Sequence, residues 1–351
     1  MFENIIKKTF YFVYDYISFS TRIQEFAVNC WNFAQFFITM DRNYVTKFQY
    51  KCSGLFIFRC YNTKDVYRVS LSEVFDLKNS VYLNNDIEMP LLGLGVYKIT
   101  DQSEANTAVR AAVQAGYRLI DTATVYKNEE QIGTAIAKSG ISRKEIFITT
   151  KVWNTAQRLG DTYGAFQRSL ERLGTDYVDL YLIHWPVPGC YLDTWKEMEK
   201  IYESGQARAI GVSNFEIHHL EELKKVSDIV PAVNQIENHP LLYRKELIEY
   251  CKANHIQVQA YAPLARGAYL DNDIMCILGT KYAHTPAQVG LRWNIQKGVA
   301  VIPKSVHSDR IRSNANIFDF EIQDEDIAIM DTMNQNYHSS GIPDDLKDIP
   351  F

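Results

Sequence analysis

The feature that most constrains the fold is a regular alternation of strand-like and helix-like segments that begins near residue 91. Short apolar runs, typical of buried strands, are separated by amphipathic stretches of helical period. The strand-like runs are residues 91–97, 117–122, 146–152, 177–185, 207–214, 231–237, 256–262 and 298–305, and the helical stretches are 104–116, 128–140, 164–174, 193–205, 217–226, 244–255 and 285–298. Eight apolar strands with helical spacers favour a closed parallel (β/α)₈ TIM barrel, because open doubly wound sheets usually have five or six strands.

The chain divides into two unequal parts near residue 75. Residues 1–75 are crowded with Phe and Tyr, contain one glycine (Gly54) and no proline, and show no sustained period of 2 or 3.6 residues. We assign this extension no structure and no chemistry. An appendage is the simplest interpretation, and a membrane- or partner-binding arm is the alternative. Residues 76–351 form the barrel domain, which begins with a predicted β-hairpin at the barrel base, turning at Asn84 and Asn85.

Charge and cysteine usage exclude several classes of function. The net charge of −5 and the pI near 5.9 give no reason to expect a nucleic-acid partner. The six cysteines lack metal-type spacing, so we expect no metal site, free thiols and a reducing, cytoplasmic location. No stretch approaches the roughly 20 uninterrupted apolar residues that cross a bilayer, so no membrane partner is expected. With no sign of an oligomer interface, we expect a monomer.

Polar residues cluster where the predicted strands end. In a (β/α)₈ barrel the chemistry lies at the carboxyl ends of the strands. Such ends carry Asp121, Lys151, His184 with Trp185, Ser213 with Asn214, Tyr261, and Lys304 with Ser305. The strand at 231–237 carries Gln235, and Tyr126 follows in the loop after Asp121. Each admits a structural alternative: a helix cap, a rim aromatic, a core histidine or a surface lysine. Together they indicate one cavity, because unpaired buried charges are costly.

An Asp–Lys pair beside a tyrosine has a definite chemical use. A neighbouring ammonium favours the phenolate, so Lys151 is expected to lower the pKa of Tyr126 from ~10 to about 8, worth ~3 kcal/mol. Tyr126 would then donate a proton to a developing alkoxide, while Asp121 holds the lysine. A neutral His184 would orient the carbonyl oxygen.

The chain resembles the aldo-keto reductases, and the motifs that carry the resemblance occur in that family's order. They are GYRLIDTATVYKNEEQIG, DYVDLYLIHWP, ARAIGVSNF, PAVNQIENHP, YAPLARG and IPKSVHSDRI, and the resemblance spans roughly residues 78–351. The short loop after His184 is similar to the branch of glyoxal (methylglyoxal) reductases, 2,5-diketo-gluconate reductases and prostaglandin F synthases. The glycines Gly93 and Gly95 do not make a dinucleotide fingerprint.

The resemblance implies an NADP-dependent oxidoreductase that reduces aldehydes and ketones with NADPH, yielding NADP⁺. Small aldehydes and α-dicarbonyls such as methylglyoxal, or prostaglandin H₂ reduced to prostaglandin F2α, are the implied substrates. It implies the catalytic tetrad Asp121, Tyr126, Lys151 and His184; nicotinamide contacts from Ser213, Asn214, Gln235 and Tyr261; phosphate and adenine contacts from Leu264, Lys304, Ser305, Arg310 and Asn314; and a substrate pocket with Tyr97, His184 and Trp185.

Three positions depart from the family pattern. Tyr97 stands where many relatives have Trp, Ala262 replaces a common Ser near the phosphates, and Ser313 stands where a Glu often contacts adenine. The last two put cofactor affinity in doubt, although Lys304 and Arg310 keep NADPH the better expectation than NADH. A non-catalytic NADPH-binding sensor or scaffold subunit on the same fold, or a crystallin-like structural protein, is the alternative class of function.

Overall fold

The computed structural model describes residues 37–40, 44–51, 55–60, 66–70 and 79–346, and it separates into two compact units, residues 1–77 and 78–351. In the first unit, strands β1 (Phe37–Met40), β2 (Tyr44–Lys51), β3 (Leu55–Cys60) and β4 (Val66–Ser70) form an antiparallel sheet in sequential order. The sequence predicted no structure here, because the aromatic residues follow no clear period.

The second unit contains an eight-stranded parallel sheet. In chain order its strands are β7 (Leu94–Gly95), β8 (Leu119–Asp121), β9 (Phe147–Val152), β10 (Leu180–Ile183), β11 (Ile210–Ser213), β12 (Val233–Glu237), β13 (Gln257–Tyr261) and β14 (Ala300–Val301). Each strand pairs with the next, and parallel bridges from Leu92 to Val301 and from Gly95 to Lys304 join the first strand to the last. The sheet therefore closes, which confirms the predicted (β/α)₈ barrel.

Gly95 permits this closure. The junction between the first and last strands, residues 92–95 and 301–304, is here called the β7–β14 seam. A Cβ atom at Gly95 would lie 2.7 Å from the carbonyl oxygen of Ile302 across this seam. Any side chain would push the two strands apart. Packing, rather than phosphate binding, explains this glycine.

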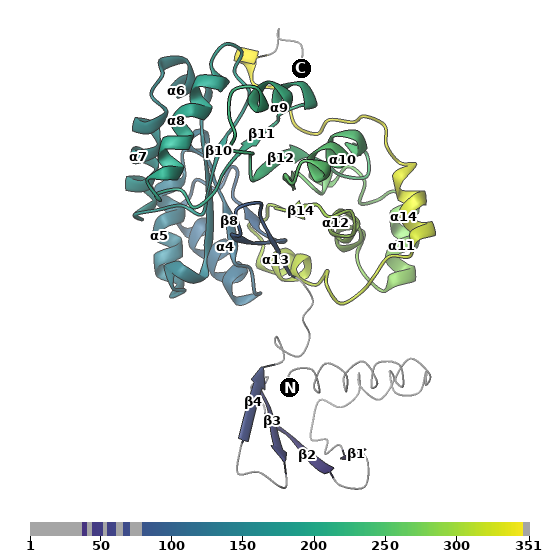
Figure 1. The fold of residues 1–351 in the computed structure, drawn as a ribbon. Helices are drawn as coiled ribbons and strands as arrows, with labels where there is room; N and C mark the ends of the chain where they lie inside the picture. Colours follow the sequence, from purple (N-terminus) through teal and green to yellow (C-terminus); the bar gives the residue numbers. More distant parts are fainter. Residues whose placement is uncertain (1–36, 41–43, 52–54, 61–65, 71–78, 347–351) are drawn as a thin grey trace. The chain divides into compact units, whose positions relative to one another are not determined.

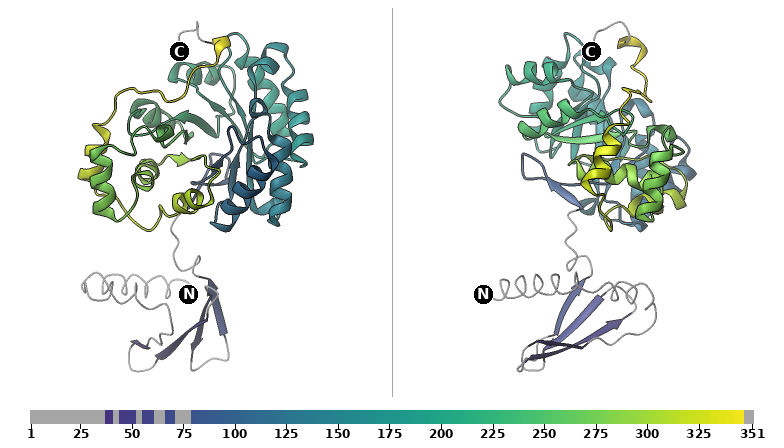
Figure 2. Two further views of the ribbon diagram at one scale, coloured as in Figure 1. Left: turned by 180° about the vertical axis from the view of Figure 1, so that it is seen from behind. Right: turned by 90° about the vertical axis from the view of Figure 1, so that its right-hand side faces the viewer.

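Helices surround the strands in every view (Figures 1 and 2). The seven predicted helical stretches are confirmed as α4 (Gln102–Gln114), α5 (Glu129–Ser139), α7 (Thr162–Leu173), α8 (Tyr191–Glu203), α9 (Ile217–Lys224), α10 (Lys245–Ala253) and α12 (Pro286–Gln296). Four further helices escaped prediction: α6 (Asn154–Leu159), α11 (Asp273–Tyr282), α13 (Ser308–Ala315) and α14 (Asp324–Asp331). The start of α11 could have been predicted from Asn272, whose side chain caps the helix by accepting from the N–H of Ile274.

The predicted hairpin is β5 (Ser80–Tyr82) with β6 (Glu88–Pro90), and it lies at the barrel base. Its side chains Leu83 and Met89 pack with residues of the barrel strands in one buried cluster. Asn84 Nδ2 donates to the carbonyl of Pro231, just before β12. The hairpin therefore covers the amino ends of the strands and leaves their carboxyl ends for a site.

Candidate active site

A buried ion pair lies between neighbouring strands at the carboxyl end of the barrel. Lys151 Nζ lies 2.6 Å from Asp121 Oδ1 and also donates to the carbonyl oxygen of Thr122 at 2.8 Å. The lysine is completely buried and the aspartate is 2% exposed. A buried pair of this kind rarely adds net stability over apolar residues, so its presence favours a chemical use.

Tyr126 lies beside this pair. It ends a 3₁₀ turn (Thr124–Tyr126) that follows β8, and Lys127 then adopts a left-handed backbone conformation with φ of 54°. Lys151 Nζ lies 5.1 Å from the centre of the Tyr126 ring, and the His184 ring meets that ring edge-on at 5.7 Å. The four residues predicted as a tetrad are therefore together.

The loop that carries Tyr126 is fixed by Asn128. The Asn128 amide donates to the carbonyls of Val96 and Ile99 at 2.8 and 2.9 Å, and its oxygen accepts from the Thr122 hydroxyl at 2.7 Å. Asn128 is fully buried. Because these bonds join the loop to the segment after β7, the position of the phenol does not depend on the loop alone.

The predicted acidification of Tyr126 is wrong. Burial raises the pKa of the Tyr126 phenol well above its ordinary value, and the negative charge of Asp121 acts in the same direction. The main reason is burial, because a phenolate at this enclosed position would lose its hydration. Tyr126 is a phenol that holds its proton at neutral pH.

His184 is neutral, as expected. Burial, followed by the positive charge of Lys151, lowers the pKa of His184 well below its ordinary value of 6.5. Its Nδ1 atom is buried and has no hydrogen-bond partner among the described residues. A neutral imidazole in this position can share one N–H with an incoming oxygen atom.

The residues predicted to hold a nicotinamide form one hydrogen-bonded group on β11 to β13. The Tyr261 hydroxyl donates to Asn214 Oδ1 at 2.7 Å, and Asn214 Nδ2 donates to the Ser213 hydroxyl at 3.1 Å. Gln235 Nε2 donates to Asp121 Oδ2 and to Gln259 Oε1, both at 2.7 Å. Gln235 thus connects this group to the ion pair.

The loop after β13 has a strained backbone. Ala262, Ala265 and Arg266 have φ angles of 45°, 46° and 51°, a region that residues with a side chain seldom adopt. Leu264, predicted to line a pyrophosphate, lies within this loop and is half-buried. Such strain is concentrated at binding sites.

Of the predicted phosphate-binding residues, Lys304 and Ser305 lie just before α13 and Arg310 lies in its first turn. Lys304 and Arg310 are exposed, and neither forms an ion pair with any residue that the structure describes. Ser305 is buried, and its hydroxyl accepts from the N–H of His307 at 3.1 Å. Asn314 is also buried. Two unpaired cations beside a helix amino end fit an anionic phosphate group.

Aromatic rings border the tetrad. Tyr97 is 46% exposed, and its ring centre lies 5.0 Å from that of Tyr126. Trp153 meets His184 edge-on at 5.1 Å, although it was not predicted as a site residue. Trp185 is half-buried, and its carbonyl accepts from Gln157 Nε2 at 3.0 Å. Trp153 follows β9 directly, so its position at a strand end could have indicated it.

A separate cavity of about 510 Å³ lies at the amino ends of the strands. Ser80, Glu88, Phe147 and Asp179 are among the residues that line it, and none of the predicted site residues does. The polar cluster at the opposite end is therefore the candidate active site.

The fold and this cluster define a (β/α)₈-barrel enzyme with a buried Asp–Lys pair beside a tyrosine and a histidine. The sequence matches the model of the aldo/keto reductase family over residues 91–335, and the chain belongs to that family. It is therefore an oxidoreductase, as predicted. Aldo-keto reductases use NADP(H), which agrees with the predicted cofactor.

Two curated relatives are similar over nearly their whole length. A glyoxal reductase of Bacillus subtilis (strain 168) is 52% identical over 270 residues, covering 77% of this chain and 98% of the relative. A 9,11-endoperoxide prostaglandin H2 reductase of Trypanosoma cruzi (strain CL Brener) is 47% identical over 271 residues, covering 76% and 96%. Both names match the branch expected from the motifs.

Solved structures of aldo-keto reductases have the same fold as this chain. An aldo-keto reductase from a Medee basin deep-sea metagenome library has a TM-score of 0.72 at 45% identity, covering 74% of this chain and 96% of that one. A Bombyx mori aldo-keto reductase, solved in complex with NADP, has a TM-score of 0.72 at 37% identity, covering 77% and 97%.

Among the described residues, none of the helices has the length and apolar character needed to span a membrane.

Proposed function

We propose that this protein reduces small aldehydes and α-dicarbonyls, methylglyoxal among them, to alcohols with NADPH. The observation that carries the proposal is the convergence of the Asp121–Lys151 pair, Tyr126 and His184 at the carboxyl end of the barrel. The similarity to a glyoxal reductase supports the choice of substrate class. The similarity to a prostaglandin H2 reductase makes prostaglandin H₂, reduced to prostaglandin F2α, a second candidate substrate.

In this proposal Tyr126 donates the proton. The raised pKa of Tyr126 keeps the phenol protonated at neutral pH, and the carbonyl oxygen becomes basic enough to take that proton only as it develops alkoxide character. Lys151, held by Asp121, then stabilises the phenolate that remains. His184, neutral and edge-on to the Tyr126 ring, orients the carbonyl oxygen through an N–H.

Other residues of the chain position the cofactor, which supplies a hydride when bound. Ser213, Asn214 and Gln235 would bond a carboxamide, and Tyr261 would stack on the nicotinamide ring. Leu264 would line the pyrophosphate. Lys304, Ser305 and Arg310 would hold the 2′-phosphate, and Asn314 would reach the adenine. The unpaired cations at the start of α13 support NADPH over NADH.

Tyr97, Trp185 and His184 would border the substrate. Tyr97 is nearly half exposed, so this side of the pocket is open to solvent. An open pocket supports tolerance for several small carbonyl compounds rather than one.

The direct test is the loss of NADPH absorbance with methylglyoxal, with a nitrobenzaldehyde and with prostaglandin H₂. We expect turnover with at least one of the small aldehydes. Tight NADPH binding without turnover of any carbonyl compound would instead support a sensor or scaffold subunit.

A further inference from the structure

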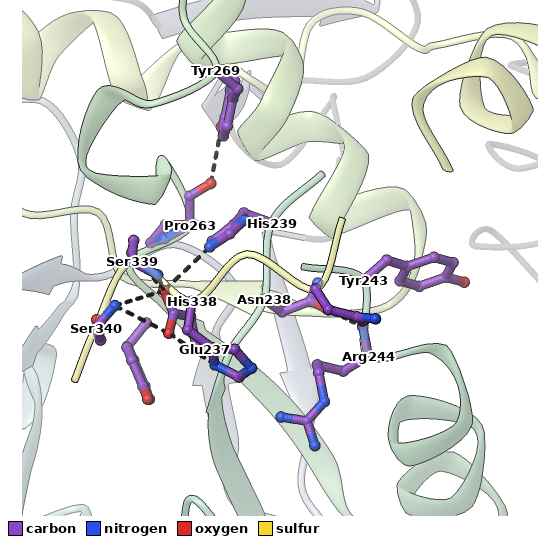
Figure 3. A network of polar contacts seen from close by, with 12 residues as sticks. Glu237, Asn238, His239, Tyr243, Arg244, Pro263, Tyr269, His338, Ser339 and Ser340 are labelled. Carbon is purple, nitrogen blue, oxygen red and sulfur yellow. Dashed lines mark hydrogen bonds and ion pairs between the residues drawn. The ribbon is translucent and has the colours of Figure 1, made fainter. Parts of the chain in front are cut away.

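Glu237 is a buried carboxylate with an unusual set of donors. It is the last residue of β12 and is 3% exposed. Its Oε1 accepts from the N–H of Ser339 at 2.8 Å, from the Ser339 hydroxyl, and from the N–H of Ser340 at 3.2 Å (Figure 3). Among these hydrogen-bond partners, only His239 is near Glu237 in the sequence, and its Nε2 lies 3.2 Å from Oε1. A buried carboxylate is costly unless donors satisfy it, and here they come from a segment about 100 residues later.

These bonds favour an ionised Glu237. Burial alone would raise the pKa of Glu237, but the hydrogen bonds from His239 and Ser339 outweigh it and hold the pKa below its ordinary value. Oε2 also accepts from the N–H of Ser340 at 3.3 Å, and His338 Nδ1 lies 3.8 Å from it. Hydrogen bonds to a charged acceptor are about twice as strong as neutral ones.

Residues 334–346, here called the C-terminal strap, are anchored at both ends. At the near end, the N–H groups of Gln335 and Tyr337 donate to the carbonyl of Leu241 at 3.0 and 3.1 Å. At the far end, Asp345 pairs with Arg158 Nη2 at 3.0 Å and accepts from Asn154 Nδ2 at 3.2 Å. Figure 1 shows the strap in yellow, running from α14 to a second 3₁₀ turn, Asp344–Leu346.

Two of the residues that hold the strap, Glu237 and Asn154, border the candidate active site. Glu237 is the register partner of Tyr261, the residue expected to stack on the cofactor. Asn154 directly follows Trp153, whose ring meets His184. The strap therefore crosses the carboxyl end of the barrel between these two points.

We propose that Glu237 is a positioning residue that latches the C-terminal strap across the mouth of the site and so limits which carbonyl compounds fit. Glu237 takes no part in the chemistry. Its carboxylate fixes the strap, and the strap narrows the opening over the tetrad. The selectivity part of the proposal rests on the proposed function, whereas the latch itself does not.

The test compares Glu237→Gln with Glu249→Gln, which removes one exposed carboxylate from α10. In Glu237→Gln the remaining carbonyl oxygen can still accept from the strap, but the acceptor loses its negative charge, and the NH₂ group in place of Oε2 cannot accept from Ser340. Amide hydrogen exchange of the strap should rise by about tenfold, as expected when hydrogen bonds to a charged acceptor become hydrogen bonds to a neutral one. It should stay unchanged in Glu249→Gln. Equal exchange in both variants would overturn the latch, whether or not the protein reduces any carbonyl compound.

Kinetics then test the selectivity. In Glu237→Gln we expect KM for methylglyoxal to rise several-fold with kcat nearly unchanged, and kcat/KM for a bulky aromatic aldehyde to rise relative to methylglyoxal. An equal fall of kcat for both substrates would contradict the positioning role. Absence of turnover in the unmodified protein would sink the proposed function and the selectivity with it, but the exchange result would still decide the latch.

A double-mutant cycle removes the ambiguity of a misfolded variant. Ser339→Ala removes one donor from the strap and leaves the barrel untouched. If the two residues act as one latch, Glu237→Gln should increase strap exchange less in the Ser339→Ala background than alone. Fully additive effects would overturn the proposal. Ser339→Ala alone should raise strap exchange even if Glu237→Gln does not fold, and an unchanged value there would also overturn it.

Discussion

At the scale of single residues, Tyr126 is the proposed proton donor. We predict that Tyr126→Phe lowers kcat by at least about 10²-fold, the usual contribution of a positioned acid. The dissociation constant for NADPH should change little, because only the hydroxyl is lost. Steady-state kinetics and fluorescence titration measure the two quantities, and substantial reduction by the variant would show that another group supplies the proton.

The pKa of Tyr126 sets the alkaline limit of the reaction. Because the pKa is raised above 10, the phenol stays protonated between pH 7 and pH 9, and single-turnover reduction should be flat over this range. If Lys151 instead lowered the pKa to about 8, the rate would fall about tenfold per pH unit above that value. A rapid-mixing pH profile distinguishes the two cases.

At the residue scale, the sequence predicted where the tetrad residues lie but not the direction in which the pKa of Tyr126 shifts. Asp121, Lys151 and His184 were identified because a strand pattern shows where each strand ends. The pKa of Tyr126 was misjudged, because the balance of burial and opposing charges exists only in three dimensions. Gln259 and Glu237 were missed for a similar reason: their partners lie on other strands or about 100 residues away.

At the scale of single elements, α13 has one cation in its first turn, Arg310, and another, Lys304, in the segment just before it. We predict that Lys304→Met or Arg310→Met weakens NADPH about 10- to 100-fold, corresponding to the loss of one charged hydrogen bond. NADH lacks the 2′-phosphate, so its affinity should change little. Binding titrations with both nucleotides decide the matter, and equal losses would place the phosphate elsewhere.

The β7–β14 seam requires a residue without a side chain at position 95. Gly95→Ala should lower the free energy of unfolding by about 1–3 kcal/mol, because the new Cβ would meet the carbonyl of Ile302. Gly341→Ala is the matched control, since a Cβ there meets nothing within 4 Å. Urea denaturation measures both variants. A Gly95→Ala protein as stable as the control would mean that the seam relaxes at no cost.

Element types were more predictable than element number. The seven predicted helices were identified because they bury apolar faces against the barrel. The short helices α6, α13 and α14 were missed, whereas α9, also eight residues long, was identified from the amphipathic stretch at 217–226. The sheet of the extension was missed for want of any period.

At the scale of the whole molecule, the two units suggest separate roles. We propose that residues 76–351 form the catalytic domain. A chain beginning at residue 76 should fold with an unchanged melting temperature and unchanged kcat/KM. Calorimetry and the NADPH assay check this, and aggregation or inactivity of the shortened chain would assign residues 1–75 a part in the barrel's stability.

The seam between residues 92–95 and 301–304 has a consequence for biosynthesis. A ribosome releases the first strand of the ring long before the last, so an incomplete ring with two bare edges must persist through most of translation. Bare strand edges recruit other chains. We therefore expect nascent chains of this protein to depend on chaperones until residues 301–304 have left the exit tunnel.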